Sequence, residues 1–418
     1  YGLVGSEMCI RDSTYTVNDN TTSEGQTATF TITRDGTDEA SSIFVNTSEY
    51  DATSGVDFET LSGKQVDFAI GEATKLDDPL AFAHMDPPTP WITWIMALWN
   101  ASLNQNLLHP AISPVARDFE TKAIDWLCPY FGMNGGHLTP GSTLSNLTAL
   151  WVARDLKGVK KIVASEEAHI SMKKSANILG LEFETIPCNH DSSINVDLLP
   201  TDLSKSCLVL TAGTTAAGAI DNLNIANNAA WVHVDAAWAG PLRISQKHGY
   251  LLNGVEKADS ISISGHKWIF QPKDSSILLF KNTEEANQSI SMSAGYLSSS
   301  NIGIMGSRGA IGLPLLATLM AWGKEGLAKR LDGCMTLSDE LHSHLLETGV
   351  HIFAKPTTAV ILWRHEEPYS AVELFFRLPA GSASLATISG EKWIRHVAAN
   401  PNMEIDLLCS EITTALGY

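Results

Sequence analysis

The chain has 418 residues, of which 44% are hydrophobic and 18% charged, a balance typical of a folded globular protein. At this length we expect a large buried core divided between two or three domains. The net charge of −18 argues against nucleic acid and anionic membranes as partners, because both require a basic face. No apolar run reaches the roughly 18 residues that a membrane helix needs. The longest such runs, 91–99 and 313–322, are predicted to be core helices.

Six cysteines are scattered along the chain without a CxxC pair or a regular spacing. This distribution favours free thiols in a reducing compartment over a disulfide framework. No basic-then-apolar leader opens the sequence, so we expect a cytoplasmic protein. The cysteines are Cys9, Cys128, Cys188, Cys207, Cys334 and Cys409.

The first 76 residues differ in texture from the rest of the chain. Residues 1–13 (YGLVGSEMCIRDS) have no hydrophobic periodicity and resemble a translated sequencing adapter, so we expect a non-native leader there. Residues 14–76 are predicted to be rich in β-strands. A Thr-rich run over 27–33 alternates with apolar residues, and further strand-like runs follow at 42–48 and 66–68.

The order of these runs, SEGQTATFTITRDG followed by SGVDF and GEATK, resembles the Calx-β repeat, a calcium-associated β-sandwich of adhesion proteins. Only part of a repeat is present, and such a fragment would leave an open sheet edge and a one-sided core. Its acidic residues Glu24, Asp51 and Asp57 are too few for a shell of roughly 6–8 oxygen ligands. We interpret them as surface carboxylates and predict no metal site. A calcium-binding adhesion protein remains an alternative function.

From residue 77 onward, short apolar strands alternate with longer helical stretches. This alternation is typical of an α/β fold with a mostly parallel sheet. We expect the large domain to span 77–328 and a small α+β domain, opening with a helix over 331–346, to span 329–418. Strands are predicted over 161–164, 207–210 and 230–234, and helices over 144–157 and 171–179.

Two charged residues stand at the ends of predicted buried strands. Lys267 follows the strand at 260–264, and burial there favours the neutral amine that can form a Schiff base. Asp235 ends the strand that begins at Trp231, where a carboxylate without a partner would be costly. A protonated pyridine nitrogen would be a suitable partner. Taken alone, each residue has a simpler interpretation, as a surface lysine and a structural aspartate.

A Gly- and Ser-rich turn over 134–146 leads into a predicted helix. Small residues before a helix let backbone N–H groups approach a phosphate, and the helix dipole favours the anion. Gly141, Ser142 and Thr143 are the predicted contacts. An ordinary turn and helix cap would have the same composition.

Polar residues follow two more strands. His169 comes after the strand at 161–164 and is positioned to stack on a planar ring, although a lone histidine is more often a core or surface residue. Thr214 and Thr215 follow the strand at 207–210 and bring hydroxyls to the same carboxyl edge, where open α/β sheets bind ligands. Five such features in this order favour one ligand site over five separate coincidences.

Several motifs resemble those of the group II amino-acid decarboxylases, the family of aromatic-amino-acid and glutamate decarboxylases, which depend on pyridoxal 5'-phosphate (PLP). They are HVDAAWAG, SGHKW, SEEAHISMKKSANILG, TAGTTAAGAID and NQNLLHPAISPVARDFETKAIDWL. The resemblance runs from about residue 84 to residue 399. It implies an aspartate-aminotransferase-like α/β architecture (PLP fold type I), an amino-acid substrate, and a homodimer.

The resemblance also implies a role for each predicted site residue. Lys267 would hold PLP as a Schiff base, and Asp235 would pair with the pyridinium nitrogen. His169 would stack on the ring, with Thr214 or Thr215 beside it. The phosphate would be held by Gly141, Ser142, Thr143 and His266.

Tyr296 lies where the family has a mobile loop that reaches the active site, often that of the partner subunit. It would donate a proton to the substrate carbon after CO2 leaves. Relatives that make aldehydes often have phenylalanine at this position, so the tyrosine favours simple decarboxylation to an amine. Aldehyde synthesis and carbon–carbon lysis on the same fold remain alternatives.

The sequence departs from the family at both ends. Relatives begin with a helical segment that wraps around the partner, whereas this chain has the β-rich segment, and its C-terminal domain is expected to be short. Residues 306–308 are only an approximate counterpart of a characteristic arginine motif, so the sequence assigns no particular substrate. A chimeric gene that joins an adapter remnant, a Calx-β fragment and a decarboxylase would explain this pattern.

Overall fold

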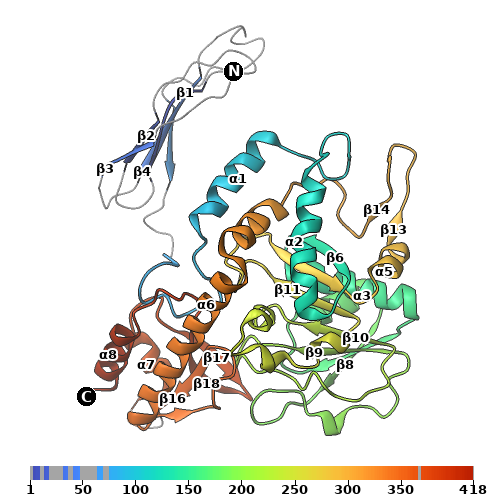
Figure 1. The fold of residues 1–418 in the computed structure, drawn as a ribbon. Coiled ribbons are helices and arrows are strands. Elements are labelled where there is room, and N and C mark those ends of the chain that lie inside the picture. The colour runs from blue at the N-terminus through green and yellow to red at the C-terminus, as the bar shows by residue number, and fades with distance from the viewer. Residues whose placement is uncertain are drawn as a thin grey trace. The chain divides into compact units, whose positions relative to one another are not determined.

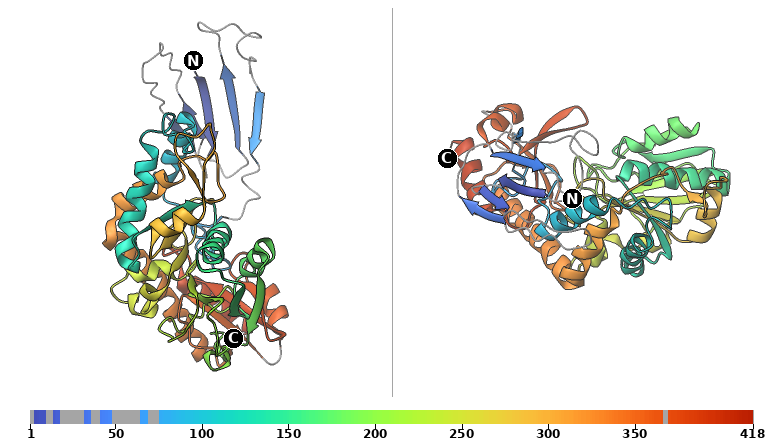
Figure 2. Two further views of the ribbon diagram at one scale, coloured as in Figure 1. Left: turned by 90° about the vertical axis from the view of Figure 1, so that its right-hand side faces the viewer. Right: turned by 90° about the horizontal axis from the view of Figure 1, so that it is seen from above.

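The computed structural model describes residues 75–365 and 369–417, together with the backbone of five strands nearer the N-terminus. The chain splits into two compact units, Tyr1–Lys75 and Leu76–Tyr418. Figures 1 and 2 show the elements of each unit.

The first unit contains a five-stranded antiparallel sheet in the order β3-β2-β1-β4-β5. The predicted β-rich texture agrees with this sheet. β1 nevertheless lies within residues 1–13, which lack hydrophobic periodicity. It pairs with β2 and β4, and these two strands supply its hydrogen bonds. The acidic residues of the Calx-β-like segment lie outside the described residues, so that resemblance stays a prediction. The strands are β1 (Leu3–Cys9), β2 (Thr14–Val17), β3 (Ile32–Asp35), β4 (Ser41–Thr47) and β5 (Lys64–Phe68).

The second unit is built on a seven-stranded sheet in the order β6-β12-β11-β10-β9-β7-β8. β12 runs antiparallel to both of its neighbours and the other strands are parallel, so the predicted mostly parallel α/β sheet is confirmed. The strands are β6 (Gly135–Thr139), β7 (Lys161–Ser165), β8 (Glu182–Ile186), β9 (Ser206–Thr211), β10 (Trp231–Asp235), β11 (Ser260–Ser264) and β12 (Ser276–Phe280).

The two faces of this sheet differ in chemistry at its centre. Parallel strands that are covered on both sides are usually apolar on both faces. In β10, however, Trp231, His233 and Asp235 alternate with Val232 and Val234. In β11, serines at 260, 262 and 264 alternate with two isoleucines. Since side chains two residues apart share a face, one face is apolar and the other carries a buried polar row.

The polar row is covered by α3 (Ser142–Lys157), whose Asn146 hydrogen bonds with side chains of β10. α3 begins where β6 ends, so its N-terminus lies at the carboxyl edge of the sheet. α4 (Ser171–Leu179) has the predicted bounds. The remaining elements of this part are α2 (Ala116–Phe131), α5 (Thr283–Ser289), the hairpin β13 (Ser291–Met292) and β14 (Asn301–Ile302), and the short helices η2 (Val196–Leu198), η3 (Gly240–Ile244), η4 (Gly249–Leu252) and η5 (Val255–Lys257).

The predicted core helix at 91–99 is helical but does not lie in the core. α1 (Trp91–Leu103) packs against α6 (Gly312–Glu347), and Thr93 is its buried residue. Its large apolar side chains lie on the outside, and Trp91 is 65% exposed. A run that is apolar all round gives no sign of which face is covered, which explains the wrong prediction. The second run, 313–322, does lie in the core at the start of α6.

The C-terminal part holds a four-stranded antiparallel sheet in the order β15-β16-β18-β17. α6 crosses the predicted domain boundary at residue 328, and its helical geometry is interrupted at Gly323, where φ is 59°. The Trp238 indole N–H donates to the carbonyl of Thr358, 3.0 Å away, and ties the large domain to this part. Its elements are β15 (His351–Ile352), β16 (Val360–Arg364), α7 (Ala371–Arg377), β17 (Ser384–Ile388), β18 (Glu391–Val397) and α8 (Ile405–Leu416). Among the described residues, no helix combines the length and the apolar character that crossing a membrane requires.

The pairing of β6 with β12 generates a stability prediction. A Cβ added to Gly136 would lie 1.9 Å from the carbonyl oxygen of Leu278 on β12, so the strands would have to separate. Gly136→Ala is therefore expected to lower the free energy of unfolding by about 1–3 kcal/mol or more, measured by urea denaturation. Gly333→Ala is the control. Gly333 lies within α6, and its added Cβ would lie 3.5 Å from the Cβ of Pro401, an ordinary contact distance. Because alanine favours a helix more than glycine does, the stability should be kept or raised. Equal destabilisation by both substitutions would contradict the argument.

Candidate active site

A cavity of about 340 Å³ lies at the carboxyl edge of the seven-stranded sheet. Loops that follow β6, β7, β9, β10 and β11 supply its lining, as expected for a ligand site on an open α/β sheet. The cavity brings together most of the predicted site residues, although these are up to 126 positions apart between Gly141 and Lys267. The predicted residues in its lining are Gly141, Ser142, Thr143, His169, Thr215, Asp235, His266 and Lys267.

Two predicted residues lie outside that lining. Thr214 is buried, and its hydroxyl accepts a hydrogen bond from the backbone N–H of Ala219 at 3.0 Å, so it stabilises the turn after β9. Tyr296 lies in the loop between β13 and β14 and is 75% exposed. Figure 1 shows this hairpin projecting from the large domain.

The N-terminus of α3 is open toward the cavity. Gly141 is its N-cap residue and provides no side-chain cap. The Ser142 hydroxyl lies 2.7 Å from that of Ser264 and 2.8 Å from that of Ser276, which anchors the first turn to β11 and β12. Backbone N–H groups of an uncapped first turn attract an anion, and the helix dipole adds to the attraction.

His266 lies beside this turn with one ring nitrogen already occupied. Its Nδ1 donates to the carbonyl of Ser275 at 2.9 Å, because a carbonyl can only accept. Burial is the main cause that lowers the pKa of His266, and the nearby Lys273 acts in the same direction. A contact from Nε2 to an anion therefore requires the protonated ring, which a phosphate dianion would favour.

Lys267 is withdrawn from solvent at the end of β11. Burial lowers the pKa of its amine below the ordinary value of 10.5. The carboxylates of Asp235 and Asp86 oppose this shift, whereas the charges of Arg395 and Lys273 add to it. The net effect raises the fraction of neutral amine, the form that attacks an aldehyde.

Asp235 is a buried carboxylate, 4% exposed, whose hydrogen bonds come from neutral donors. One oxygen, Oδ2, accepts from Asn146 at 3.1 Å. The other, Oδ1, accepts from the Ala237 N–H at 3.1 Å and the Ser262 hydroxyl at 3.3 Å. A buried carboxylate held in this way attracts a cationic ligand atom into the cavity.

His169 reaches the cavity from the loop after β7. Its Nδ1 accepts hydrogen bonds from the Ser171 hydroxyl at 2.8 Å and the Ser171 backbone N–H at 3.3 Å, so the ring proton is on Nε2. Burial is the main cause that lowers the pKa of His169. The histidine is thus held as a neutral, oriented ring.

These residues fit the cofactor implied by the motifs. The cavity offers a buried amine for the aldehyde, a carboxylate for the pyridinium nitrogen and an uncapped helix start for the phosphate. Thr211 lines the same cavity, and its buried hydroxyl has no partner among the described residues. Such an unsatisfied group is the kind of donor that a bound polar ring would engage.

Sequence reasoning did not assign roles to Asn146, Thr211 or Arg395. An asparagine within an otherwise apolar stretch of helix was a usable signal, because burial of an amide requires partners. Thr211 ends β9 directly before the threonines that were singled out. Arg395 is 7% exposed on β18, and its link to Lys267 depends on packing between the two domains.

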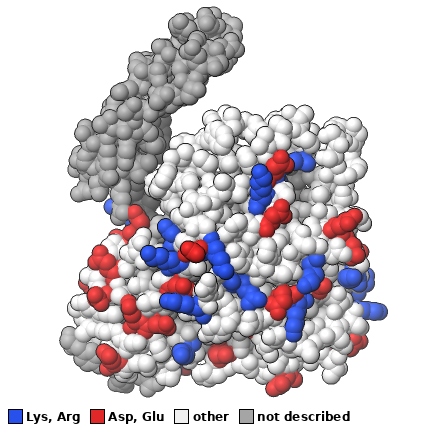
Figure 3. Space-filling view, in the orientation of Figure 1, with Lys and Arg blue, Asp and Glu red and all other residues white. Residues whose placement is uncertain are grey.

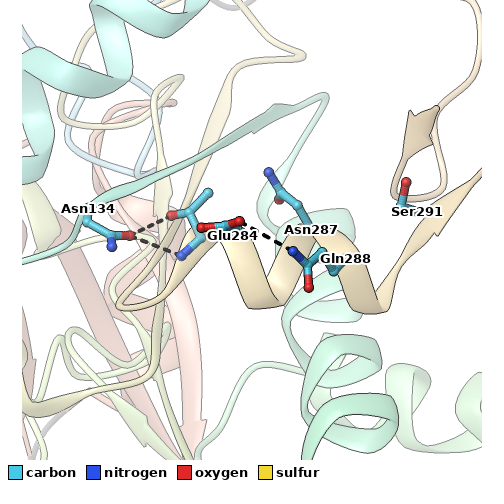
Figure 4. Close-up of a pocket in the computed structure, with 6 residues that line it drawn as sticks. Asn134, Glu284, Asn287, Gln288 and Ser291 are labelled. Carbon is cyan, nitrogen blue, oxygen red and sulfur yellow. Dashed lines mark hydrogen bonds between the residues drawn. The ribbon is translucent and has the colours of Figure 1, made fainter. Parts of the chain in front are cut away.

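A larger hollow of about 610 Å³ lies on α5, and its lining carries none of these groups. Figure 4 shows Asn134 accepting hydrogen bonds from Thr283 and Gln288 donating to Glu284. Its lining consists of Asn134, Thr283, Glu284, Asn287, Gln288 and Ser291. Glu284 is the one titratable side chain in that set, so the lining offers no acid–base pair.

Comparisons with known proteins identify the family of the chain. Residues 57–365 match the pyridoxal-dependent decarboxylase conserved domain, and the match begins inside the predicted Calx-β-like segment. The chain is 28% identical to an L-2,4-diaminobutyrate decarboxylase of Acinetobacter baumannii, over 72% of this chain and 70% of the relative. It is 29% identical to an L-2,4-diaminobutyrate decarboxylase of Rhizobium meliloti, over 84% of this chain and 79% of the relative.

Solved structures share the fold. The crystal structure of tryptophan decarboxylase from Catharanthus roseus superposes with a TM-score of 0.74, at 19% identity, over 83% of this chain and 85% of that one. The glutamate decarboxylase domain from Vibrio parahaemolyticus gives a TM-score of 0.71 at 24% identity, over 83% and 82%.

The chain belongs to the pyridoxal-dependent decarboxylase family. Its cofactor is PLP and its activity is the decarboxylation of an amino acid.

The lowered pKa of Lys267 predicts how the apoprotein takes up PLP. Because the neutral amine reacts, the rate of uptake should rise with pH through a midpoint below 10.5, the ordinary value for lysine. Lys273→Ala removes a cation that lowers the pKa of Lys267, so its midpoint should move up. Stopped-flow absorbance over a pH series measures both profiles. A midpoint at or above 10.5 in the unsubstituted protein would contradict the buried-amine argument.

Proposed function

We propose that this cavity decarboxylates an L-amino acid to its amine and CO2, with Lys267 as the residue that holds PLP. One observation carries the proposal: a buried lysine, a buried aspartate and an uncapped helix start line a single cavity. Their chemistry matches the aldehyde, the ring nitrogen and the phosphate of one molecule.

When bound, PLP draws electrons from the substrate's α-carbon and so allows the bond to the carboxylate to break. Asp235 would keep a proton on the ring nitrogen by electrostatic attraction. His169 would contact the ring, and so would Thr215. Gly141, Ser142, Thr143 and His266 would hold the phosphate. Of the two adjacent threonines, Thr215 is favoured because the Thr214 hydroxyl is used within its own turn.

Arg395 is proposed to orient the substrate through its carboxylate. Its guanidinium donates to the Ala83 carbonyl at 3.1 Å and the Ser384 hydroxyl at 3.2 Å, and its buried Nε has no partner among the described residues. Burial lowers its pKa to about 10, so it remains charged at neutral pH. A buried cation near Lys267 suits an anionic substrate group.

The substrate class is proposed only as an L-amino acid. Relatives of this chain are named for L-2,4-diaminobutyrate, aromatic amino acids and aspartate. These side chains are respectively cationic, aromatic and anionic, so the shared part is the amino-acid backbone on which the proposed site acts.

A cytoplasmic homodimer completes the proposal. The cysteines of the described part of the chain are free thiols, which supports a reducing compartment. α1 has no charged residue, and Figure 3 shows no charge over it. An apolar surface of this kind is typical of an interface, and we propose that a second copy covers it. The exposed side chains are Trp91, Trp94, Ile95, Leu98, Trp99 and Leu103.

Replacement of Lys267 tests the central proposal. Wild-type protein mixed with PLP should show the visible absorption band of lysine-bound PLP, and Lys267→Ala should lack it and lose decarboxylation by on the order of a thousandfold or more. Lys205→Ala, at an exposed lysine, is the control and should keep both. A panel of amino acids identifies the reaction, since amine plus CO2 supports decarboxylation and aldehyde plus ammonia and peroxide supports an aldehyde synthase. Identical spectra for wild type and Lys267→Ala would refute the proposal.

Tyr296 is proposed as the proton donor to the α-carbon of the partner's site, since it is exposed and lies outside its own cavity. Tyr296→Phe and Lys267→Ala should each be inactive in amine formation alone. Dissociated and reassembled together, they should regain about a quarter of wild-type activity, because half the dimers are hybrids with one complete site. No recovery, in mixtures shown by sedimentation to contain hybrid dimers, would rule out a role in trans.

A further inference from the structure

Behind Asp235, away from the cavity, a buried chain of hydrogen bonds crosses the polar face of the sheet. Asn146 on α3 contacts Asp235 through Nδ2 at 3.1 Å and His233 through Oδ1 at 3.0 Å. His233 lies 2.8 Å from the Ser260 hydroxyl, which in turn accepts from the Trp231 indole at 2.8 Å. Asn146, His233 and Ser260 have no exposed surface.

The chemistry of the two ends fixes the direction of every bond in this chain. An indole N–H can only donate and an ionised carboxylate can only accept. Asn146 Nδ2 therefore donates to Asp235, and Asn146 Oδ1 accepts from His233 Nε2. The neutral ring of His233 then has no proton on Nδ1, so Ser260 donates to Nδ1 and accepts from Trp231. The Asn146 amide is thereby left with its NH2 group facing Asp235.

The second hydrogen of the same amide is also used. Asn146 Nδ2 donates to the Ser171 hydroxyl at 2.9 Å, and Ser171 holds the ring of His169. A reversed amide would place its carbonyl oxygen against the Asp235 carboxylate and leave His233 without an acceptor. Burial lowers the pKa of His233 to about 4, so the neutral, single-donor form persists at neutral pH.

We propose that Asn146 is a positioning residue for Asp235 and that His233 sets the orientation of the Asn146 amide. This inference rests on the proposed function, because the hydrogen-bonded chain affects binding only if Asp235 contacts the ring nitrogen of PLP. Asn146 holds the carboxylate aimed into the cavity, and His233 prevents the amide from turning over. Neither residue lines the cavity.

A packing role alone makes a different prediction. If the chain of bonds only stabilised the core, its loss would weaken every ligand of the cavity alike. If it acts through Asp235, its loss should weaken ligands that carry a ring nitrogen more than ligands that lack one. The PLP analogue with carbon in place of that nitrogen separates the two cases, because it keeps the aldehyde and the phosphate.

The test measures dissociation constants of PLP and of this analogue by absorbance titration of the full chain. Wild type should bind PLP more tightly than the analogue. Asn146→Leu should weaken PLP by about tenfold or more, as expected for the loss of a hydrogen bond to a charged group, and should change the analogue by less than about threefold. Thr148→Val, a near-isosteric change at a buried position of the same helix, should preserve the wild-type preference.

Circular dichroism and the unfolding midpoint show whether Asn146→Leu folds. If it does not, two variants at His233 test the same inference. His233→Gln should keep the preference for PLP, because the glutamine amide retains a donor toward Asn146, whereas His233→Phe should lose it. The inference is overturned if a folded Asn146→Leu or His233→Phe variant retains the wild-type preference, or weakens both ligands equally. A wild type that binds both ligands equally would instead refute the role of Asp235 in the proposed function.

Discussion

The structure of the catalytic domain depends on one buried carboxylate. Asp235 ends the central strand of the sheet at 4% exposure, where an isolated charge would be strongly disfavoured. The buried carboxylate needs hydrogen-bond donors on the protein side, and Asn146, Ser262 and Ala237 supply them. On its other side the carboxylate faces the cavity, where it attracts a cationic group of a bound ligand. The requirement of this charge explains why the sheet carries a polar row on one face while its other face is an ordinary hydrophobic core.

The order of elements brings the remaining groups to the same place. In the parallel part of the sheet every strand ends at one edge, so the residues that follow β7, β9, β10 and β11 meet although they are distant in sequence. The reversed strand β12 sits between β6 and β11, and Ser276 on it bonds the first turn of α3. The lysine, the carboxylate and the helix start are thus fixed by backbone pairing, which makes a rigid site.

Much of this was accessible from sequence because it depends on local rules. Strand ends at Ser264 and Asp235 followed from alternation, and the helix at 171–179 followed from its apolar spacing. Features that depend on how elements pack against one another could not be predicted from these local rules. The outward face of α1 depends on its packing against α6, and the meeting of Asn146 with His233 depends on the packing of α3 onto the sheet. The choice of Thr215 over Thr214 depends on the hydrogen bond from Ala219 in the turn after β9. Asn146 and His233 were visible as polar residues in apolar surroundings, but the partner of each is 87 positions away.

The interruption of α6 bears on how the two domains of the second unit are joined. α6 begins in the core of the large domain and continues into the C-terminal part. At Gly323 the backbone leaves helical geometry and the helix is kinked. α6 therefore consists of two helical segments that meet at a kink. Lys267 lies before this kink in the chain and Arg395 beyond it, so the change of direction at one glycine helps to place the domain that carries Arg395 against the domain that carries Lys267.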